Sequence, residues 1–205
     1  MSEKEEKQDN IMGTMGVTHL IVKMSLPLMI SMLIQALYNI VDSMFVARVS
    51  ETALTAVSLA FPLQNLLIAF GVGTGVGMAS FLSRKLGEKD TESATKAAGN
   101  GITLAVITWI MFAILGLSIV KPFMALFTDD KELLELSTGY SEIVMILSFF
   151  MLLSMMNERI LQGTGDSFSS MLSQMTGAIT NIILDPVFIF VFKMGVNGAA
   201  IATVI

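Results

Sequence analysis

The chain consists of long apolar segments separated by short polar ones. Each of the first five apolar segments approaches or exceeds the roughly 20 residues that a helix, rising about 1.5 Å per residue, needs to cross a bilayer core about 30 Å thick. The alternation typical of a barrel strand is absent. The pattern predicts an all-α, polytopic membrane helix bundle with helices over Leu20 to Val46, Ala53 to Leu82, Ala94 to Val120, Gly139 to Leu161 and Phe168 to Phe192, and a sixth that begins near Val196 and still continues at Ile205.

Composition supports a membrane protein. Of the 205 residues, 54% are hydrophobic and 14% are charged, whereas soluble domains average about 45–50% apolar and 25% charged residues. Residues 1–19 lack the basic region and cleavage site of a secretory signal, so we predict a cytoplasmic tail there. The chain has no cysteine, which excludes disulfides and thiolate metal sites. The net charge of -5 argues against a nucleic-acid partner.

Basic residues predict the orientation, because Lys and Arg are retained on the cytoplasmic side of a membrane. With the N-terminus in the cytoplasm, the inner side holds eight of them, namely Lys4, Lys7, Lys23, Arg84, Lys85, Lys89, Lys96 and Arg159. The outer side holds four, namely Arg48, Lys121, Lys131 and Lys193. This imbalance favours a multi-pass protein with a cytoplasmic N-terminus.

Two acids fall inside the predicted spans. Asp42 lies six residues before Arg48, and Asp185 lies eight residues before Lys193, which places them about 9 and 12 Å below the outer ends of their helices. Thr203, seven residues into the sixth helix, falls at about 10 Å. An ionised carboxylate at such a depth costs at least about 2.5 kcal/mol unless it meets a partner or water. These three polar groups are therefore expected to share one level.

Each acid also ends a polar stripe on one helix face. The first stripe is formed by Gln35, Asn39 and Asp42, and the second by Gln174, Ala178, Asn181 and Asp185. Pro186 cannot donate to the carbonyl four residues earlier, which frees another oxygen nearby. Such oxygens suit a hard cation or a proton equally. The alternative is that each acid is a buried structural residue that pairs with a neighbouring helix.

Several short segments, in this order and spacing, resemble the N-terminal half of multidrug and toxic compound extrusion (MATE) transporters. They are SLPLMI from Ser25, YNIVDSMFV from Tyr38, SRKLGEKD from Ser83, QGTGD from Gln162, NIILDPVFIF from Asn181 and GVNGAAIATVI from Gly195. The resemblance implies a twelve-helix antiporter of two six-helix lobes in the plasma membrane of a microbe, which expels cationic and amphipathic compounds against an inward H+ or Na+ gradient. Residues 20–205 would form its N-terminal lobe, ending within the sixth helix of a chain about twice as long.

The resemblance also assigns roles to residues. It implies a cation site formed by Asp42, Asn181, Asp185 and Thr203, and a hinge in the first helix at Pro27. It offers Gln35, Tyr38 and Tyr140 as substrate-binding residues. The expected partners are small-molecule substrates, the lipid bilayer and a C-terminal lobe, with H+ or Na+ as coupling ion, no other metal or cofactor, and no enzyme activity.

Other readings compete with this one. A flippase for lipid-linked saccharides has the same general architecture but should present basic residues to a central cavity, and no predicted helix carries Lys or Arg away from its ends. A non-transporting fragment is a third possibility. GTGD at Gly163 to Asp166 matches an intramembrane aspartyl protease motif, but Asp166 and Asp42 are predicted at opposite faces of the membrane, so a turn is the preferred interpretation. GVGTGVG at Gly71 to Gly77 contains two small-xxx-small pairs and predicts close helix packing.

Overall fold

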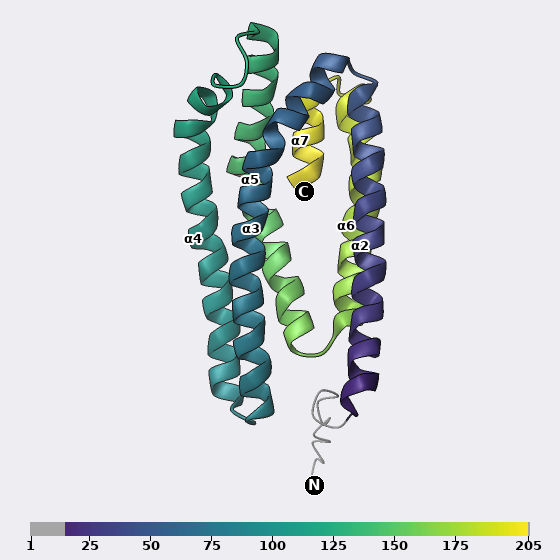
Figure 1. Cartoon of the computed structure of the whole chain (residues 1–205), viewed down its shortest axis with the longest axis vertical. Coiled ribbons are helices and arrows are strands. Elements are labelled where there is room, and N and C mark those ends of the chain that lie inside the picture. Colours follow the sequence, from purple (N-terminus) through teal and green to yellow (C-terminus); the bar gives the residue numbers. More distant parts are fainter. Residues whose placement is uncertain (1–14, 205) are drawn as a thin grey trace.

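The computed structural model describes residues 15–204 (Figure 1). Within them, the helices are α2 (Val17–Ala47), α3 (Glu51–Gly87), α4 (Thr91–Met124), α5 (Lys131–Gly163), α6 (Ser167–Pro186), the π-helical turn η1 (Val187–Val191) and α7 (Val196–Val204). Five segments, α2 to α5 and α6 with η1, are long and apolar enough to cross a membrane. The predicted all-α membrane fold is therefore confirmed. Most of the predicted tail, including Lys4 and Lys7, lies outside the described residues, as does Ile205.

The helices extend beyond the apolar segments because polar residues cap their ends. α5 shows the largest difference, since it begins eight residues before the predicted Gly139. The Asp130 carboxylate accepts hydrogen bonds from the backbone N–H groups of Glu132 and Leu133 at 2.8 and 3.1 Å, which satisfies donors that the first helical turn leaves free. The polar first turns of α5 thus belong to the helix although their sequence is not apolar.

The predicted fifth helix is interrupted near its end. α6 stops as a regular α-helix at Pro186, and η1 continues it with wider turns, in which the Phe192 N–H donates to the Val187 carbonyl at 2.9 Å. Proline has no N–H to donate to the preceding turn, so the hydrogen-bond register shifts there. The break lies immediately after Asp185.

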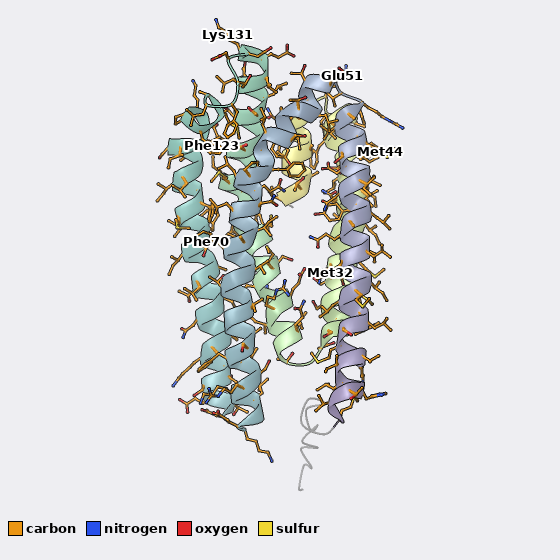
Figure 2. All side chains as sticks on the ribbon, in the orientation of Figure 1. Met32, Met44, Glu51, Phe70, Phe123 and Lys131 are labelled. Atoms are coloured by element: carbon orange, nitrogen blue, oxygen red, sulfur yellow. The ribbon has the colours of Figure 1, made fainter. Side chains whose placement is uncertain are left out.

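The helices form two groups (Figure 1). α2 packs along α6, while α3, α4 and α5 pack together, and α7 descends beside α5 and η1. The links α2–α3, α4–α5 and η1–α7 lie at the upper end in this view, and the links α3–α4 and α5–α6 lie at the lower end. Glu51 and Lys131 in Figure 2 mark the upper starts of α3 and α5.

Among residues 15–204, the two groups share an apolar core only at the upper end. There, Val46 of α2, Ile189 of η1 and Val196 of α7 join apolar residues of α3, α4 and α5 in one cluster. A separate lower cluster around Met78 and Met156 contains residues of α3, α4 and α5 alone. The α2–α6 pair is thus held to the other helices by apolar packing mainly at the upper end.

Glycines let α3 approach α5 closely on one face. A Cβ added at Gly71 would lie 2.9 Å from a Leu152 methyl carbon, and one at Gly75 would lie 2.7 Å from the Arg159 side chain. The predicted close packing is confirmed for this pair. It is wrong for Gly73 and Gly77, where an added Cβ meets no atom of residues 15–204 within 4 Å. The second pair lies on a face of α3 that α5 does not cover.

Gly198 permits the closest approach between α7 and η1. A Cβ added there would lie 2.8 Å from the carbonyl carbon and oxygen of Phe188, which are backbone atoms that cannot rotate away. Any side chain at this position must therefore push α7 away from η1.

We expect Gly198→Ala to lower the midpoint of thermal unfolding in detergent, because overpacking of this kind costs about 1–3 kcal/mol. Gly177→Ala is the matched control, since Gly177 is an exposed glycine of α6 with open space around it. That control should unfold at or slightly above the wild-type temperature, because alanine favours helix more than glycine does. Equal midpoints for the two variants would contradict the predicted constraint.

Candidate functional site

The site is built around two carboxyl groups that meet between α2 and α6. Asp42 lies six residues before the C-cap residue Arg48 of α2, and Asp185 is the last residue before Pro186 in α6. Their carboxyl groups contact each other across the helix pair. Asp185 is 0% exposed, whereas Asp42 is half-buried. Two helices therefore bring together acids that lie 143 residues apart in the sequence (185 − 42).

These acids lack hydrogen-bond donors. In the ionised state, Asp42 Oδ1 and both carboxylate oxygens of Asp185 have no donor among residues 15–204. The side-chain oxygen Oδ1 of Asn181, one helical turn from Asp185 and 7% exposed, is unpaired as well. A buried oxygen without a partner costs about 1–3 kcal/mol, and more when it is charged. Four such oxygens in one place form a site that a small cation or a proton would stabilise.

Two more helices contribute hydroxyl groups near the acids. Tyr140 of α5 is 2% exposed, contacts the Thr203 side chain and lies within electrostatic range of both carboxyl groups. The Thr203 hydroxyl of α7 donates a hydrogen bond to the Ala199 carbonyl at 2.8 Å. The structure thus pairs Asp42 with Asp185 and Tyr140 with Thr203, and the Tyr140 hydroxyl is near enough to the two acids to be affected by their charge.

The sequence did not predict this position of Tyr140. A helix that starts at Gly139, as the sequence predicted, would place Tyr140 in its first turn, at the membrane surface. The observed start at Lys131 places Tyr140 nine residues, or about 14 Å, into the helix, close to the depth of the two acids. The Asp130 cap was the signal in the sequence that could have shown it.

The polar stripe of α2 is less covered than expected. Gln35 and Asn39 are exposed, although Gln35 contacts the half-buried Tyr38. On α6, Ala178, Asn181 and Asp185 are buried and Gln174 is half-buried. The described helices therefore cover the α6 stripe, whereas they leave Gln35 and Asn39, in the two turns of α2 below Asp42, uncovered. The reason is that α2 packs on α6 and has few contacts with the other described helices.

α2 runs through Pro27 as one helix. The Ser31 hydroxyl donates to the Pro27 carbonyl at 3.1 Å, and Ser31 and Val46 are the buried residues of α2. Figure 2 shows side chains along α2 that stand free of other helices, among them the exposed Met32 and Met44. Little side-chain packing therefore holds the part of α2 around Pro27.

The GTGD segment, Gly163 to Asp166, forms the turn between α5 and α6. A Cβ at Gly163 would lie 3.0 Å from a Leu82 methyl carbon, and Gly165 has a φ of 91°, which other residues rarely adopt. Asp166 caps α6 by accepting a hydrogen bond from the Ser169 N–H at 3.0 Å, and bonding to Ser169 lowers the pKa of Asp166 below its usual value. Asp166 is 19 residues, or about 28 Å, from Asp185 along α6 (185 − 166). It cannot act together with the acid pair.

A polar chain connects α5 and α6 at the lower end. Arg159 Nη1 donates to Gln162 Oε1 at 2.7 Å, and Gln162 Nε2 donates to the Ser170 hydroxyl at 2.9 Å. The Ser83 hydroxyl of α3 donates to the Gly163 carbonyl at 2.8 Å. These bonds hold the α5–α6 link to α3 at the end of the lobe where the two helix groups share no apolar core.

Both residues of the acid pair fall within a segment that matches a known protein family. A sequence profile described as MatE matches residues 27–187, which include Asp42, Asn181 and Asp185. The chain belongs to the MatE family.

Individual MatE relatives agree with this assignment. The chain is 29% identical over 182 residues to the multidrug export protein MepA of Staphylococcus haemolyticus, a match that covers 88% of this chain and 40% of the relative. It is 32% identical over 184 residues to the probable multidrug resistance protein YoeA of Bacillus subtilis, with 87% and 40% covered. The chain thus spans about 40% of the length of these relatives.

Solved structures share the fold. A MOP superfamily transporter from Pyrococcus furiosus superposes with a TM-score of 0.86 at 34% identity, covering 90% of this chain and 41% of that one. A multidrug resistance MATE family transporter in an outward-facing conformation gives a TM-score of 0.83 at 34% identity, covering 90% and 41%. The fold is therefore that of part of a MATE transporter.

Proposed function

We propose that this chain is the N-terminal lobe of an exporter that moves drugs and other amphipathic or cationic compounds out of the cell, driven by H+ or Na+. The main support for the proposal is the contact of the buried Asp185 carboxyl group with the half-buried Asp42 carboxyl group. Three of the four oxygens of this pair are buried without a donor among residues 15–204. The names of the relatives MepA and YoeA support the substrate class. The chain spans about 40% of these relatives, and transport is proposed for a lobe that works with a second one.

The coupling ion binds at the acid pair. Asp42, Asn181 and Asp185 supply carboxylate and amide oxygens, and Thr203 supplies a hydroxyl oxygen. Oxygens of these kinds coordinate Na+, and a carboxylate alone binds H+. Tyr140 is closed off from the surface and lies beside Thr203, so its hydroxyl serves the cation site rather than a drug. Of the three predicted substrate-binding residues, Gln35 and Tyr38 are therefore the two proposed to contact a drug. Occupation of the site removes the repulsion between the carboxylates and so links ion binding to the packing of α2 on α6.

The charge of the site distinguishes this proposal from a saccharide flippase. A pyrophosphate carrier would need cationic side chains at the centre of the lobe. The proposed site of this lobe instead consists of acids, an amide and hydroxyls, and Arg159 lies near the lower end in hydrogen-bond contact with Gln162. An acid-lined centre favours a cation-coupled exporter.

We expect Asp42→Asn and Asp185→Asn each to abolish gradient-driven efflux from vesicles that contain the transporter with this lobe, because an amide cannot exchange a proton or balance the charge of Na+. The measurement is drug efflux after an imposed pH or sodium gradient. Asp129→Asn is the control, since Asp129 is an exposed acid outside the spans, and it should leave efflux unchanged. Normal efflux by either site variant would refute the assignment.

The lower end is proposed to face the cytoplasm, because Lys23, Lys85, Lys89 and Arg159 lie on that side. The chain has no cysteine, so single cysteines can be introduced directly. We expect Lys89→Cys in intact cells to react with an impermeant maleimide only after permeabilisation, and Asp129→Cys to react before it. The reverse order would show that the N-terminus lies outside.

Pro27 is proposed as a hinge of α2, because the lower half of α2 is held by few packed side chains. Spin labels on Ile21→Cys and Leu172→Cys, both exposed positions of α2 and α6, should report a distance that changes with pH or sodium. The change should disappear in Asp42→Asn and shrink in Pro27→Ala. Labels on Met44→Cys and Phe190→Cys, at the upper end, are the control and should keep their distance. An equal change at both ends would contradict a hinge at Pro27.

A further inference from the structure

A groove runs between the lower halves of α3 and α4, apart from the acid pair. Its volume is about 520 Å³, and its lining includes Gly73, Gly77 and Phe81 of α3 and Lys96, Asn100 and Leu104 of α4. Phe81 and Leu104 are 49% and 43% exposed. Both helices are long and apolar enough to span a membrane, and within residues 15–204 all the lining residues come from these two helices, so the groove opens away from the other described helices.

The groove exists because no residue among 15–204 packs against two glycines of α3. Gly73 and Gly77 have open space where a Cβ would stand, whereas Gly71 and Gly75 on the other face are packed against α5. α3 is therefore covered by α5 on one face and open on the other. The floor of the groove is backbone, which allows a thin chain to lie close to the helix.

Polarity changes along the groove from the lower end upward. Ser93, Lys96, Asn100 and Leu104 lie two, five, nine and thirteen residues after Thr91, at depths of about 3, 8, 14 and 20 Å along α4. The lining is thus polar near the helix end and apolar deeper in. This order matches a phospholipid, whose phosphate lies at the interface and whose acyl chains lie below it.

The charge of the lining favours an anion. Lys96 is the one charged residue among the lining residues. Lys85 Nζ lies 5.8 Å from the centre of the Phe81 ring, but it pairs with Glu88 at 2.7 Å and with Asp90 at 3.5 Å, so Lys96 is the cation that faces the groove. Lys96 pairs with Glu92 at 2.6 Å, but these side chains are 71% and 80% exposed, and exposed ion pairs contribute about 0–1 kcal/mol. A lipid phosphate can therefore compete with Glu92 for Lys96.

We infer that this groove binds an anionic phospholipid, with the phosphate at Lys96 and Asn100 and an acyl chain over Gly73 and Gly77. A second copy of the chain fits less well, because a symmetric contact through the same face would bring two Lys96 side chains together. The site is independent of the proposed transport function, since it shares no residue with the acid pair.

The test places a reporter in the groove. In a Trp109→Phe background, which removes the single tryptophan of the chain, Phe81→Trp is reconstituted in nanodiscs with brominated lipids, whose bromine quenches nearby tryptophan fluorescence. We expect dibrominated phosphatidylglycerol to quench more strongly than dibrominated phosphatidylcholine at the same mole fraction. Lys96→Gln should reduce this preference about fivefold, which corresponds to about 1 kcal/mol for one basic residue at an anionic surface.

Matched variants separate the parts of the site. Lys121→Gln, at the upper end of α4, should keep the preference. Gly73→Leu with Gly77→Leu should fill the groove and reduce quenching, whereas Gly99→Leu, at another glycine with open space, should not. Native mass spectrometry of the wild-type chain and of Lys96→Gln, counting bound phosphatidylglycerol, gives the same comparison without the tryptophan changes.

Three results would overturn the inference. Equal quenching by the two lipids would show that the groove holds no preferred anionic lipid. Displacement of phosphatidylglycerol by inorganic phosphate would identify a simple anion site. Loss of quenching as the ratio of protein to lipid is raised would identify a second copy as the occupant.

Discussion

The contact between Asp42 and Asp185 is the constraint on which the rest of the lobe depends. Two carboxyl groups held between membrane helices are costly, and they persist only where the surrounding helices fix their positions. The fixing elements lie directly around them: the upper core joins α2, η1 and α7, and Gly198 lets α7 approach the turn that follows Asp185. The packing at the upper end thus holds together two groups that repel each other when both are ionised.

The sequence allowed the spans and the acids to be predicted, because both follow from the cost of burying polar groups in lipid. Asp42 and Asp185 were predicted at similar depths and do contact each other, because α2 and η1 end next to Arg48 and Lys193, from which the depths were counted. It missed Tyr140 because the start of α5 depends on the Asp130 cap rather than on hydrophobicity. The roles of the site residues still rest on the family resemblance and on the chemistry of the oxygens.

Other features depend on tertiary contacts that periodicity does not specify. The two glycine pairs of α3 have the same spacing, yet Gly71 and Gly75 face α5 while Gly73 and Gly77 face away from the other described helices. A two-residue offset on a helix turns a side chain by about 200°, so neighbouring pairs point to opposite faces. Which face receives a partner depends on where α5 returns. Likewise, Pro186 predicts a disturbed hydrogen-bond ladder, but the wider turn of η1 is known only from the structure.

The division of the apolar core into an upper and a lower cluster gives the lobe one stiff end and one compliant end. Moving the α2–α6 pair away from the other helices at the upper end would expose packed residues of α2, α3, α4, α5, η1 and α7. The same movement at the lower end would leave the lower cluster of α3, α4 and α5 intact. The lower ends are restrained mainly by the short α5–α6 link and its hydrogen bonds through Gln162. A movement of the lower half of α2 would therefore rotate α2 about its packed upper end near Val46. The acids would move by a small rotation, and the apolar core would keep its packing.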